Sequence, residues 1–183
     1  MKYKIAVSGS AETEVCPACS LGLAREVGRE VVKQDCILIT GATIGVPYEA
    51  AVGAKEAKGI SIGFSPAASE LSHRKSYKLP IDKFDVIVYT GFDYPGRNLL
   101  MTRAADGVII ICGRMGTLNE FSVAFENKKP IGVLEGSGGM ADKVREIIKG
   151  PLKGKQRIIY DTDPKRLVQR LIKLMKEKKK DDF

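Results

Sequence analysis

The sequence has no tryptophan and a single histidine, His73, among its 183 residues. One histidine cannot build a histidine-rich metal site, and a Ser-His-Asp centre is equally disfavoured, so we expect no metal and treat His73 as an exposed loop residue. No apolar run is long enough to span a bilayer. The apolar part of the N-terminus is too short for a secretory signal. We therefore expect a cytoplasmic protein without a membrane partner.

Acidic residues are outnumbered, because 30 Lys and Arg face 22 Asp and Glu, a net charge of +8. Much of this excess lies in residues 151–183, with 11 basic and 5 acidic residues. A basic surface can attract nucleic acid or anionic metabolites. The sequence has neither a basic stripe interleaved with aromatics nor a known nucleic-acid module. We interpret the charge as a solvated helix with a frayed tail at about 176–183, and expect no nucleic-acid partner.

Short apolar stretches alternate along the chain with segments of helical periodicity. This alternation predicts an α/β fold in which a mostly parallel sheet is covered on both faces by helices. Composition does not change in a way that suggests a linker, so we expect one domain over residues 1–183. Strands are expected at 4–9, 36–40, 60–65, 85–91, 108–112, 130–136 and 157–161. Helices are expected at about 20–33, 47–58, 98–105, 118–127 and 140–149 and around Leu167, Leu171 and Leu174, with a loop at 66–83.

The stretch from Tyr94 to Glu120 is the most informative part of the chain. An apolar strand, VIIIC at 108–112, breaks into a glycine loop at 113–117 and restarts as a helix. Glycines let the backbone approach an anion, and the N–H groups at a helix start point at it. Arg97 supplies a permanent cation upstream. The pattern predicts a site for a phosphorylated small molecule.

Other glycine-bearing loops follow the first, second and fourth expected strands. In a parallel sheet, ligands bind beyond the carboxyl ends of the strands, near the point where the strand order reverses. We therefore expect these loops to lie on one rim and to contact the ligand. The expected ligand contacts are Ser8, Gly9, Ser10, Gly41, Thr43, Gly45, Asn98, Gly113, Arg114, Met115, Gly116 and Thr117.

Several of these residues also have ordinary structural interpretations. Thr117 and Glu120 have the spacing of a capping box, in which each side chain accepts a hydrogen bond from the other residue's backbone N–H. Asn98 could bind substrate or cap the next helix. Ser8, Gly9 and Ser10 could contact a base or ribose, or form a plain turn. Asp106 is expected to shape the turn before its strand.

The chain has four cysteines. Cys36 and Cys112 lie in or beside apolar strand patterns and are expected to be small core residues. Cys16 and Cys19 form a C-x-x-C pair just before the first helix, where thiol redox chemistry is possible. A zinc site would need a second pair, for example from a dimer mate. The pair could also be two ordinary cysteines at a loop-to-helix junction.

The motifs, in this order, carry a family resemblance. They are Arg97, the Ala105-Asp106 pair, VIIIC and CGRMGTLNE at 112–120, together with TGATIGVPYEAAVGAKEAKG at 40–59. The chain resembles the lonely-guy family, often called "possible lysine decarboxylase", and the related molybdenum-cofactor carrier-like proteins. The resemblance covers most of the chain. The family pattern reads PGGxGTxxE, so this chain departs from it at Cys112, in place of proline, and at Arg114, in place of glycine.

The resemblance implies a single Rossmann-like three-layer domain, with about seven strands here, and a homo-oligomer, usually a dimer. In active members it implies hydrolysis of the N-glycosidic bond of nucleoside 5′-monophosphates to free base and ribose 5-phosphate. The family's catalytic arginine and glutamate correspond to Arg97 and Glu120. There is no pyridoxal-phosphate signature, and we expect no cofactor.

Two functions follow as expectations. In the first, Arg97 positions a nucleoside monophosphate, Glu120 stabilises the oxocarbenium-like state and activates water, and the 113–117 loop holds the 5′-phosphate. In the second, the chain is a non-catalytic carrier or sensor of a nucleotide-like or pterin-phosphate ligand. Arg114 favours the second function and the Arg97/Glu120 pair favours the first. A thiol-redox protein based on Cys16 and Cys19 is a third interpretation.

Overall fold

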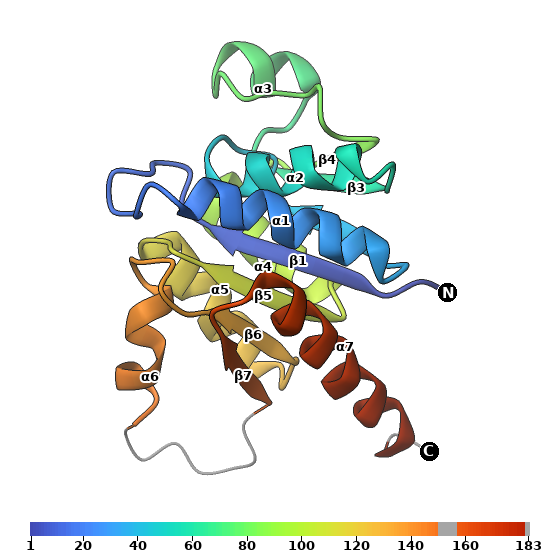
Figure 1. The fold of residues 1–183 in the computed structure, drawn as a ribbon. Helices are drawn as coiled ribbons and strands as arrows, with labels where there is room; N and C mark the ends of the chain where they lie inside the picture. The colour runs from blue at the N-terminus through green and yellow to red at the C-terminus, as the bar shows by residue number, and fades with distance from the viewer. Residues whose placement is uncertain (150–156, 182–183) are drawn as a thin grey trace.

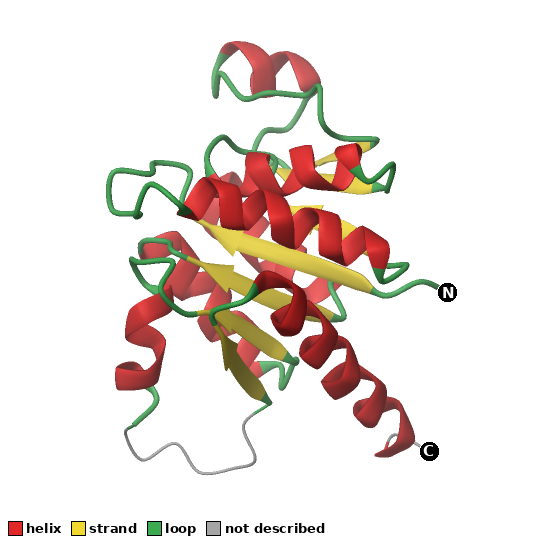
Figure 2. Ribbon diagram, viewed as in Figure 1, coloured by secondary structure: helices red, strands yellow, loops and turns green. Residues whose placement is uncertain are grey.

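The computed structural model describes residues 1–149 and 157–181. Within this part the chain folds into one parallel sheet of seven strands in the order β4-β3-β2-β1-β5-β6-β7, with helices on both faces (Figures 1 and 2). The predicted α/β, Rossmann-like three-layer fold is confirmed. The strands are β1 (Lys4–Gly9), β2 (Ile37–Thr40), β3 (Ser61–Ser65), β4 (Val86–Tyr89), β5 (Gly107–Ile111), β6 (Ile131–Leu134) and β7 (Ile158–Asp161). The helices are α1 (Ser20–Lys33), α2 (Val46–Glu56), α3 (Glu70–Lys75), α4 (Asp93–Ala104), α5 (Met115–Glu126), a 3-10 turn η1 (Ala141–Lys143), α6 (Val144–Ile147) and α7 (Pro164–Asp181).

Successive side chains of the central strands point into two different cores. On β1, Ile5 and Val7 pack in the core formed with α1, α2 and α7, whereas Ala6 packs in the core formed with α4, α5 and α6 (Figure 1). This alternation is the period of two that a strand imposes on its side chains. Because both faces are covered, β5 is buried along its whole length. Burial of each such aliphatic side chain stabilises the folded state by roughly 1.5–3 kcal/mol.

The strand order reverses beside β1. β1 pairs with β2 on one side and with β5 on the other, with Ile5 opposite Gly107 and Gly9 opposite Ile111. The chain leaves β1 and β5 at neighbouring points of the same sheet edge. The loops that follow these strands therefore diverge around a crevice, which is where ligands bind in this class of sheet.

The segment at 66–83, predicted as a loop, contains α3. Ser69 begins this helix, because its side chain accepts a hydrogen bond from the N–H of Ser72. His73 lies on α3 and is completely buried, so the prediction of an exposed histidine was wrong. Its ring is held from both sides, with Nδ1 2.8 Å from Ser65 Oγ and Nε2 3.0 Å from the carbonyl oxygen of Pro80. Those partners come from β3 and from the chain beyond α3, and periodicity within the segment does not reveal them.

Other boundaries also differ from the prediction. Helix α4 begins at Asp93, five residues before the predicted start, so Arg97 is helical and does not follow a turn. Helix α7 continues to Asp181, so residues 176–181 are helical, and the last part of the predicted frayed tail, 182–183, lies outside the described residues. Among residues 1–149 and 157–181, none of the helices has both the length and the apolar character needed to cross a membrane.

Candidate functional site

A cleft of about 460 Å³ opens at the carboxyl end of the sheet, where the loops after β1, β2 and β5 meet the start of α4. Every predicted catalytic or ligand-binding residue lines it except Gly45 and Gly113. Its walls also contain residues that were not predicted. The full lining is Val7, Ser8, Gly9, Ser10, Ala11, Glu12, Gly41, Thr43, Pro47, Tyr94, Arg97, Asn98, Arg114, Met115, Gly116, Thr117 and Glu120.

A buried ion pair forms the floor of the cleft. Arg97 Nη1, from α4, lies 3.1 Å from Glu120 Oε1, from α5. Ser8, near the end of β1, donates its hydroxyl hydrogen to Glu120 Oε2. Arg97 is 6% exposed and Glu120 is 5% exposed. The sheet and both helices of one layer therefore each contribute one member of this polar cluster.

Burial acts on both charges of the pair. Desolvation raises the pKa of the Glu120 carboxyl, while the Arg97 charge and the Ser8 hydrogen bond act in the opposite direction. Desolvation likewise lowers the pKa of the Arg97 guanidinium, against the attraction of Glu120. Each group thus offsets part of the cost of burying the other, and removal of either leaves the remaining one poorly compensated.

The position of Arg97 is set by its neighbours. The guanidinium lies directly against Gly41 of the β2–α2 loop, where a Cβ would occupy the same space. Its Cζ lies 5.7 Å from the centroid of the Tyr94 ring, and Nη1 is 3.7 Å from Met101 Sδ. Arg97 Nε is buried without a hydrogen-bond partner among the described residues. The floor of the cleft therefore holds one unused donor.

Asn98 also faces the ion pair. The amide of Asn98 is placed in the orientation that turns its nitrogen toward the neighbouring acceptor oxygens. In this orientation Nδ2 donates to Glu120 Oε1 and to the carbonyl oxygen of Tyr94, both at 2.9 Å. Asn98 is buried within α4 and does not cap that helix, which begins five residues earlier. Its place is beside Glu120, so the helix-cap interpretation was wrong.

The turn between β5 and α5 has an unusual backbone. Cys112 has φ 48° and Gly113 has φ 101°. Proline cannot reach such a positive φ, so the cysteine that replaces the family's proline matches this backbone. Helix α5 begins at Met115, and the N–H groups of its first turn have no acceptor within the helix. The start of this helix forms part of the cleft wall through Met115, Gly116 and Thr117.

The predicted capping box is absent. Arg114, and not Thr117, precedes the first helical residue of α5, so Thr117 lies inside the first turn, against Gly113. Glu120 lies a turn further along, and its carboxylate faces Arg97 and Ser8. The spacing matched a box, but the helix begins three residues earlier than the box requires.

Arg114 turns its side chain across the mouth of the cleft. Its φ of −124° is an ordinary extended conformation, so arginine fits this position without backbone strain. The guanidinium forms an ion pair with Glu12 of the β1–α1 loop, and both side chains are more than half exposed. A cation and a carboxylate thus face each other where a ligand enters.

The cysteines pair differently from the prediction. Cys16 forms a disulfide with Cys112, which lies 96 residues away in the sequence. The interpretation of Cys16 and Cys19 as a redox pair was therefore wrong in its pairing, and Cys112 is not a free core residue. Cys19 is free and exposed at the start of α1. Cys36 is buried as predicted, and burial raises the pKa of its thiol to about 11.

Glu12 and Tyr94 are the notable site residues that the sequence did not reveal. Tyr94 is the first residue of the stretch identified as most informative, but it was not predicted to contact the ligand. Glu12 lies two residues beyond the predicted Ser10, and an acidic residue in a glycine-serine loop gave no signal of its own. Within residues 1–149 and 157–181, no group of three or more His, Cys, Asp or Glu side chains is placed to hold a metal ion.

A parallel sheet with a polar cleft at its switch point, beside a helix N-terminus, defines a Rossmann-like ligand-binding protein. The chain belongs to the SLOG cluster4 family, whose model matches residues 2–168. This membership confirms the resemblance inferred from the sequence.

Three proteins illustrate the relationship. An uncharacterized protein of Archaeoglobus fulgidus is 26% identical over 132 residues, which are 72% of this chain and 80% of that protein. The molybdenum cofactor carrier protein of Chlamydomonas reinhardtii is 25% identical, with a TM-score of 0.76 over 96% of this chain and 99% of the other. The molybdenum cofactor binding protein of Rippkaea orientalis is 26% identical, with a TM-score of 0.74 over 97% of both chains.

Proposed function

We propose that this chain binds a phosphorylated small molecule, nucleotide-like or pterin-like, and acts as its carrier. The observation that carries this proposal is the engagement of Glu120. One carboxylate oxygen of Glu120 accepts a hydrogen bond from Arg97, and the other accepts one from Ser8. Glu120 is only 5% exposed. A carboxylate whose two oxygens are both hydrogen-bonded is well suited to hold the residues of a binding site in one arrangement.

The phosphate would lie at the start of α5. The unpaired N–H groups of the first helical turn and the helix dipole favour an anion there. Arg114 is placed beside this position and would exchange Glu12 for the phosphate. The remainder of the ligand would lie over Arg97 and Asn98, beside Tyr94.

Similarity to named proteins supports the carrier role. The proteins of Chlamydomonas reinhardtii and Rippkaea orientalis are named as a carrier and a binding protein of the molybdenum cofactor. Both align with nearly the whole of this chain. A ligand of that chemical class, a pterin that bears a phosphate, is therefore the first to test.

Hydrolysis of nucleoside 5′-monophosphates is the second candidate. The pairing of Arg97 with Glu120 at the floor of the cleft favours it. Glycosidic cleavage passes through an oxocarbenium-like state that a carboxylate stabilises, and a carboxyl with a raised pKa can donate a proton to the leaving base. In this reaction Glu120 would have to release Ser8 or Arg97 as the substrate enters.

One experiment separates the two functions. Purified protein is titrated by calorimetry with nucleoside 5′-monophosphates and a phosphorylated pterin, and free base and ribose 5-phosphate are followed in the same samples. Saturable binding without product supports the carrier. Release of base that is lost in a folded Glu120→Gln variant supports the hydrolase. An absence of both binding and turnover across the panel would overturn the whole proposal.

We also propose that the protein forms a homo-oligomer and is located in the cytoplasm. Edge strand β4 and helix α4 leave apolar side chains exposed, among them Val86, Leu99 and Leu100. Burial of such side chains against a second copy would stabilise a dimer. Sedimentation velocity would detect it, and a single monomeric species at micromolar concentration would contradict it. Partners of this site are small molecules, and no nucleic-acid role is proposed.

A further inference from the structure

The two sides of the cleft mouth are joined by a covalent bond. The β1–α1 loop, residues 10–19, supplies Ser10, Ala11 and Glu12 to the cleft, and the β5–α5 turn supplies Arg114. Cys16 of the loop and Cys112 of the turn form a disulfide with a Cα–Cα distance of 5.8 Å. The bond therefore ties together two segments that each contribute to the cleft wall, although neither cysteine lines the cleft.

The Cys112 side is held in place independently of the disulfide. The N–H of Cys112 donates to Ser137 Oγ at 2.8 Å, and its carbonyl oxygen accepts from the N–H of Ala141 at 2.9 Å. The carbonyl oxygen of Gly113 accepts from the N–H of Met140, also at 2.9 Å. This side would keep its conformation if the disulfide were broken.

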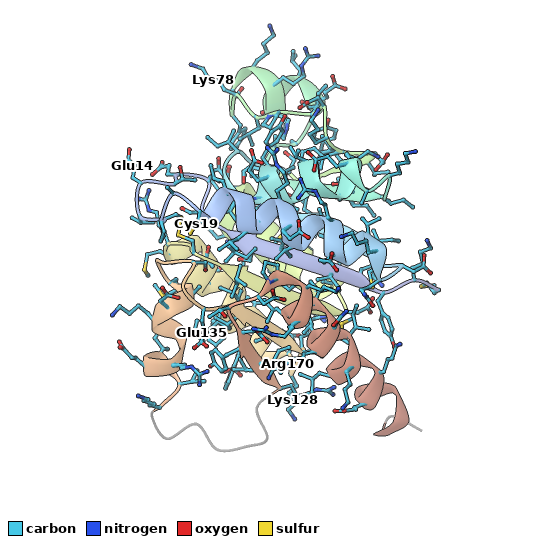
Figure 3. The ribbon with its side chains drawn as sticks, viewed as in Figure 1. Glu14, Cys19, Lys78, Lys128, Glu135 and Arg170 are labelled. Carbon is cyan, nitrogen blue, oxygen red and sulfur yellow. A yellow bond between two sulfur atoms is a disulfide. The ribbon has the colours of Figure 1, made fainter. Side chains whose placement is uncertain are left out.

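The Cys16 side depends much more on the disulfide. Within the loop the N–H of Cys16 donates to the carbonyl oxygen of Thr13, which is a local turn. The ion pair between Glu12 and Arg114 also reaches across the mouth, but both partners are exposed, and exposed pairs contribute little. Figure 3 shows Glu14 at the outer tip of this loop, directed away from the body of the molecule. Ser10, at the start of the loop, is held separately, because the N–H of Val46 donates to its carbonyl oxygen at 2.9 Å. Reduction would thus release the middle of the loop, around Glu12 and Cys16, and leave the Cys112 side in place.

We propose that the Cys16–Cys112 disulfide is a redox-controlled clamp on the ligand cleft. Cys112 is completely buried whereas Cys16 is partly exposed, so Cys16 is the half of the disulfide that an external thiolate would attack. Attack there forms a mixed disulfide and breaks the Cys16–Cys112 bond, and Cys112 leaves as a thiolate that takes a proton from solvent. The second thiol of a dithiol reductant then releases Cys16. The dithiol supplies two electrons and two protons and becomes a disulfide.

The clamp has a direct consequence for the ligand. With the bond intact, Glu12 stays arranged against Arg114, and the loop loses little conformational freedom when the ligand binds. With the bond reduced, the loop must be ordered again on each binding event, so affinity falls and exchange of the ligand accelerates. Cellular thiols reduce accessible disulfides, whereas oxidising compartments preserve them. The state of the clamp would follow the redox poise around the protein.

The test compares oxidised protein with protein reduced by dithiothreitol, in a Cys19→Ser background that prevents exchange with the free thiol. Peptide mapping establishes the bond, and hydrogen exchange is followed in segments 10–19, 112–118 and the buried strand 108–111. We expect exchange in 10–19 to rise at least about tenfold on reduction, at labelling times so short that the strand, which exchanges only by global unfolding, takes up no deuterium in either state. A Cys16→Ser variant in the same background should match the reduced protein under both conditions.

Binding of AMP, measured in parallel, connects the clamp to the proposed function. Weaker binding by the reduced protein supports both. A changed loop with no AMP binding in either state supports the clamp and rejects AMP as a ligand. Equal exchange in 10–19 in both states would overturn the clamp, as would an oxidised protein without a Cys16–Cys112 peptide. Exchange of 108–111 together with the loop at these short labelling times would also overturn it, because the bond would then hold the strand as well as the loop.

Discussion

Gly41 lies against the guanidinium group of Arg97 so closely that any side chain at position 41 would occupy the same space. The two residues come from different layers, since Gly41 follows the central strand β2 and Arg97 lies on α4. The end of the sheet therefore determines where this arginine can point. A Cβ at position 41 would force the guanidinium of Arg97 away from its present position.

Gly41→Ala should displace Arg97 and disturb the ion pair. We expect the free energy of unfolding to fall by about 1–3 kcal/mol, the usual cost of forcing a methyl group into a packed interior. Ligand affinity should fall with it. Urea denaturation measures the first effect and calorimetry the second. Gly22→Ala is the matched control, because nothing lies within 4 Å of a Cβ there. An equal loss in both variants would show that the contact with Arg97 is unimportant.

Glu120→Gln should change how stability depends on pH. Burial raises the pKa of Glu120 in the folded protein, so the folded state binds its proton more tightly than the unfolded state does. This contribution to stability is present below the unfolded pKa of about 4.3 and is lost as pH rises through the folded pKa. Glutamine does not titrate and removes this dependence.

Measured from about pH 4 to pH 8, the unfolding free energy of the wild type should therefore decline more steeply than that of Glu120→Gln. Chemical denaturation at several pH values gives both curves. Parallel curves would mean that Glu120 has an ordinary pKa, and a wild type that gains stability relative to the variant would mean that Arg97 lowers the pKa.

Arg114→Met should weaken binding of phosphorylated ligands by about tenfold, since a charge-assisted hydrogen bond contributes roughly 1.5 kcal/mol. Removing this cation should also make binding less sensitive to salt. Glu12→Gln should have the opposite effect, because it frees Arg114 for the phosphate. Titration at two salt concentrations checks both variants. Arg74→Met removes an exposed arginine on α3, outside the cleft lining, and should leave binding unchanged.

Removal of the disulfide should also lower global stability. A cross-link between residues 96 apart restricts the unfolded chain, and loss of such a bond typically costs about 2–4 kcal/mol. The variant Cys16→Ser/Cys112→Ser should show this loss in urea under non-reducing conditions. Cys19→Ser changes an exposed free thiol and should shift stability by less than about 0.5 kcal/mol. Equal stability of the double variant and the wild type would contradict the expected constraint.

Much of the fold could be predicted because the buried strands of a parallel sheet are short apolar runs with clear ends. VIIIC at 108–112 is such a run, and β5 (Gly107–Ile111) covers all of it but the last residue. Helix α3 was missed because its signal is brief. Ser69 followed by an acidic residue is a pattern typical of a helix N-terminus. Six helical residues, however, are too few to show the hydrophobic periodicity by which a helix is predicted. The burial of His73 depends on contacts with distant segments.

The sequence identified residues of single loops that the structure brings to one cleft, but it did not reveal contacts between residues from separate strands. Ser8, Arg97 and Glu120 were each identified, but their mutual contacts depend on β1 lying next to β5. The same adjacency brings Cys16 to Cys112. Strand order cannot be read from local patterns, so the nearby C-x-x-C spacing suggested the wrong partner. The capping box failed for another reason, because a shift of three residues in the helix start removes it.

The pairing of β1 with β5 also constrains how the polypeptide can mature. Ile5 and its partner Gly107 are separated by about a hundred residues, and such long-range pairing is slow because a large loop must close first. On the ribosome, β1 emerges early and one of its edges stays unpaired until β5 has been synthesised. A nascent chain that ends before β5 would expose that apolar edge, so this protein should need protection from aggregation during translation.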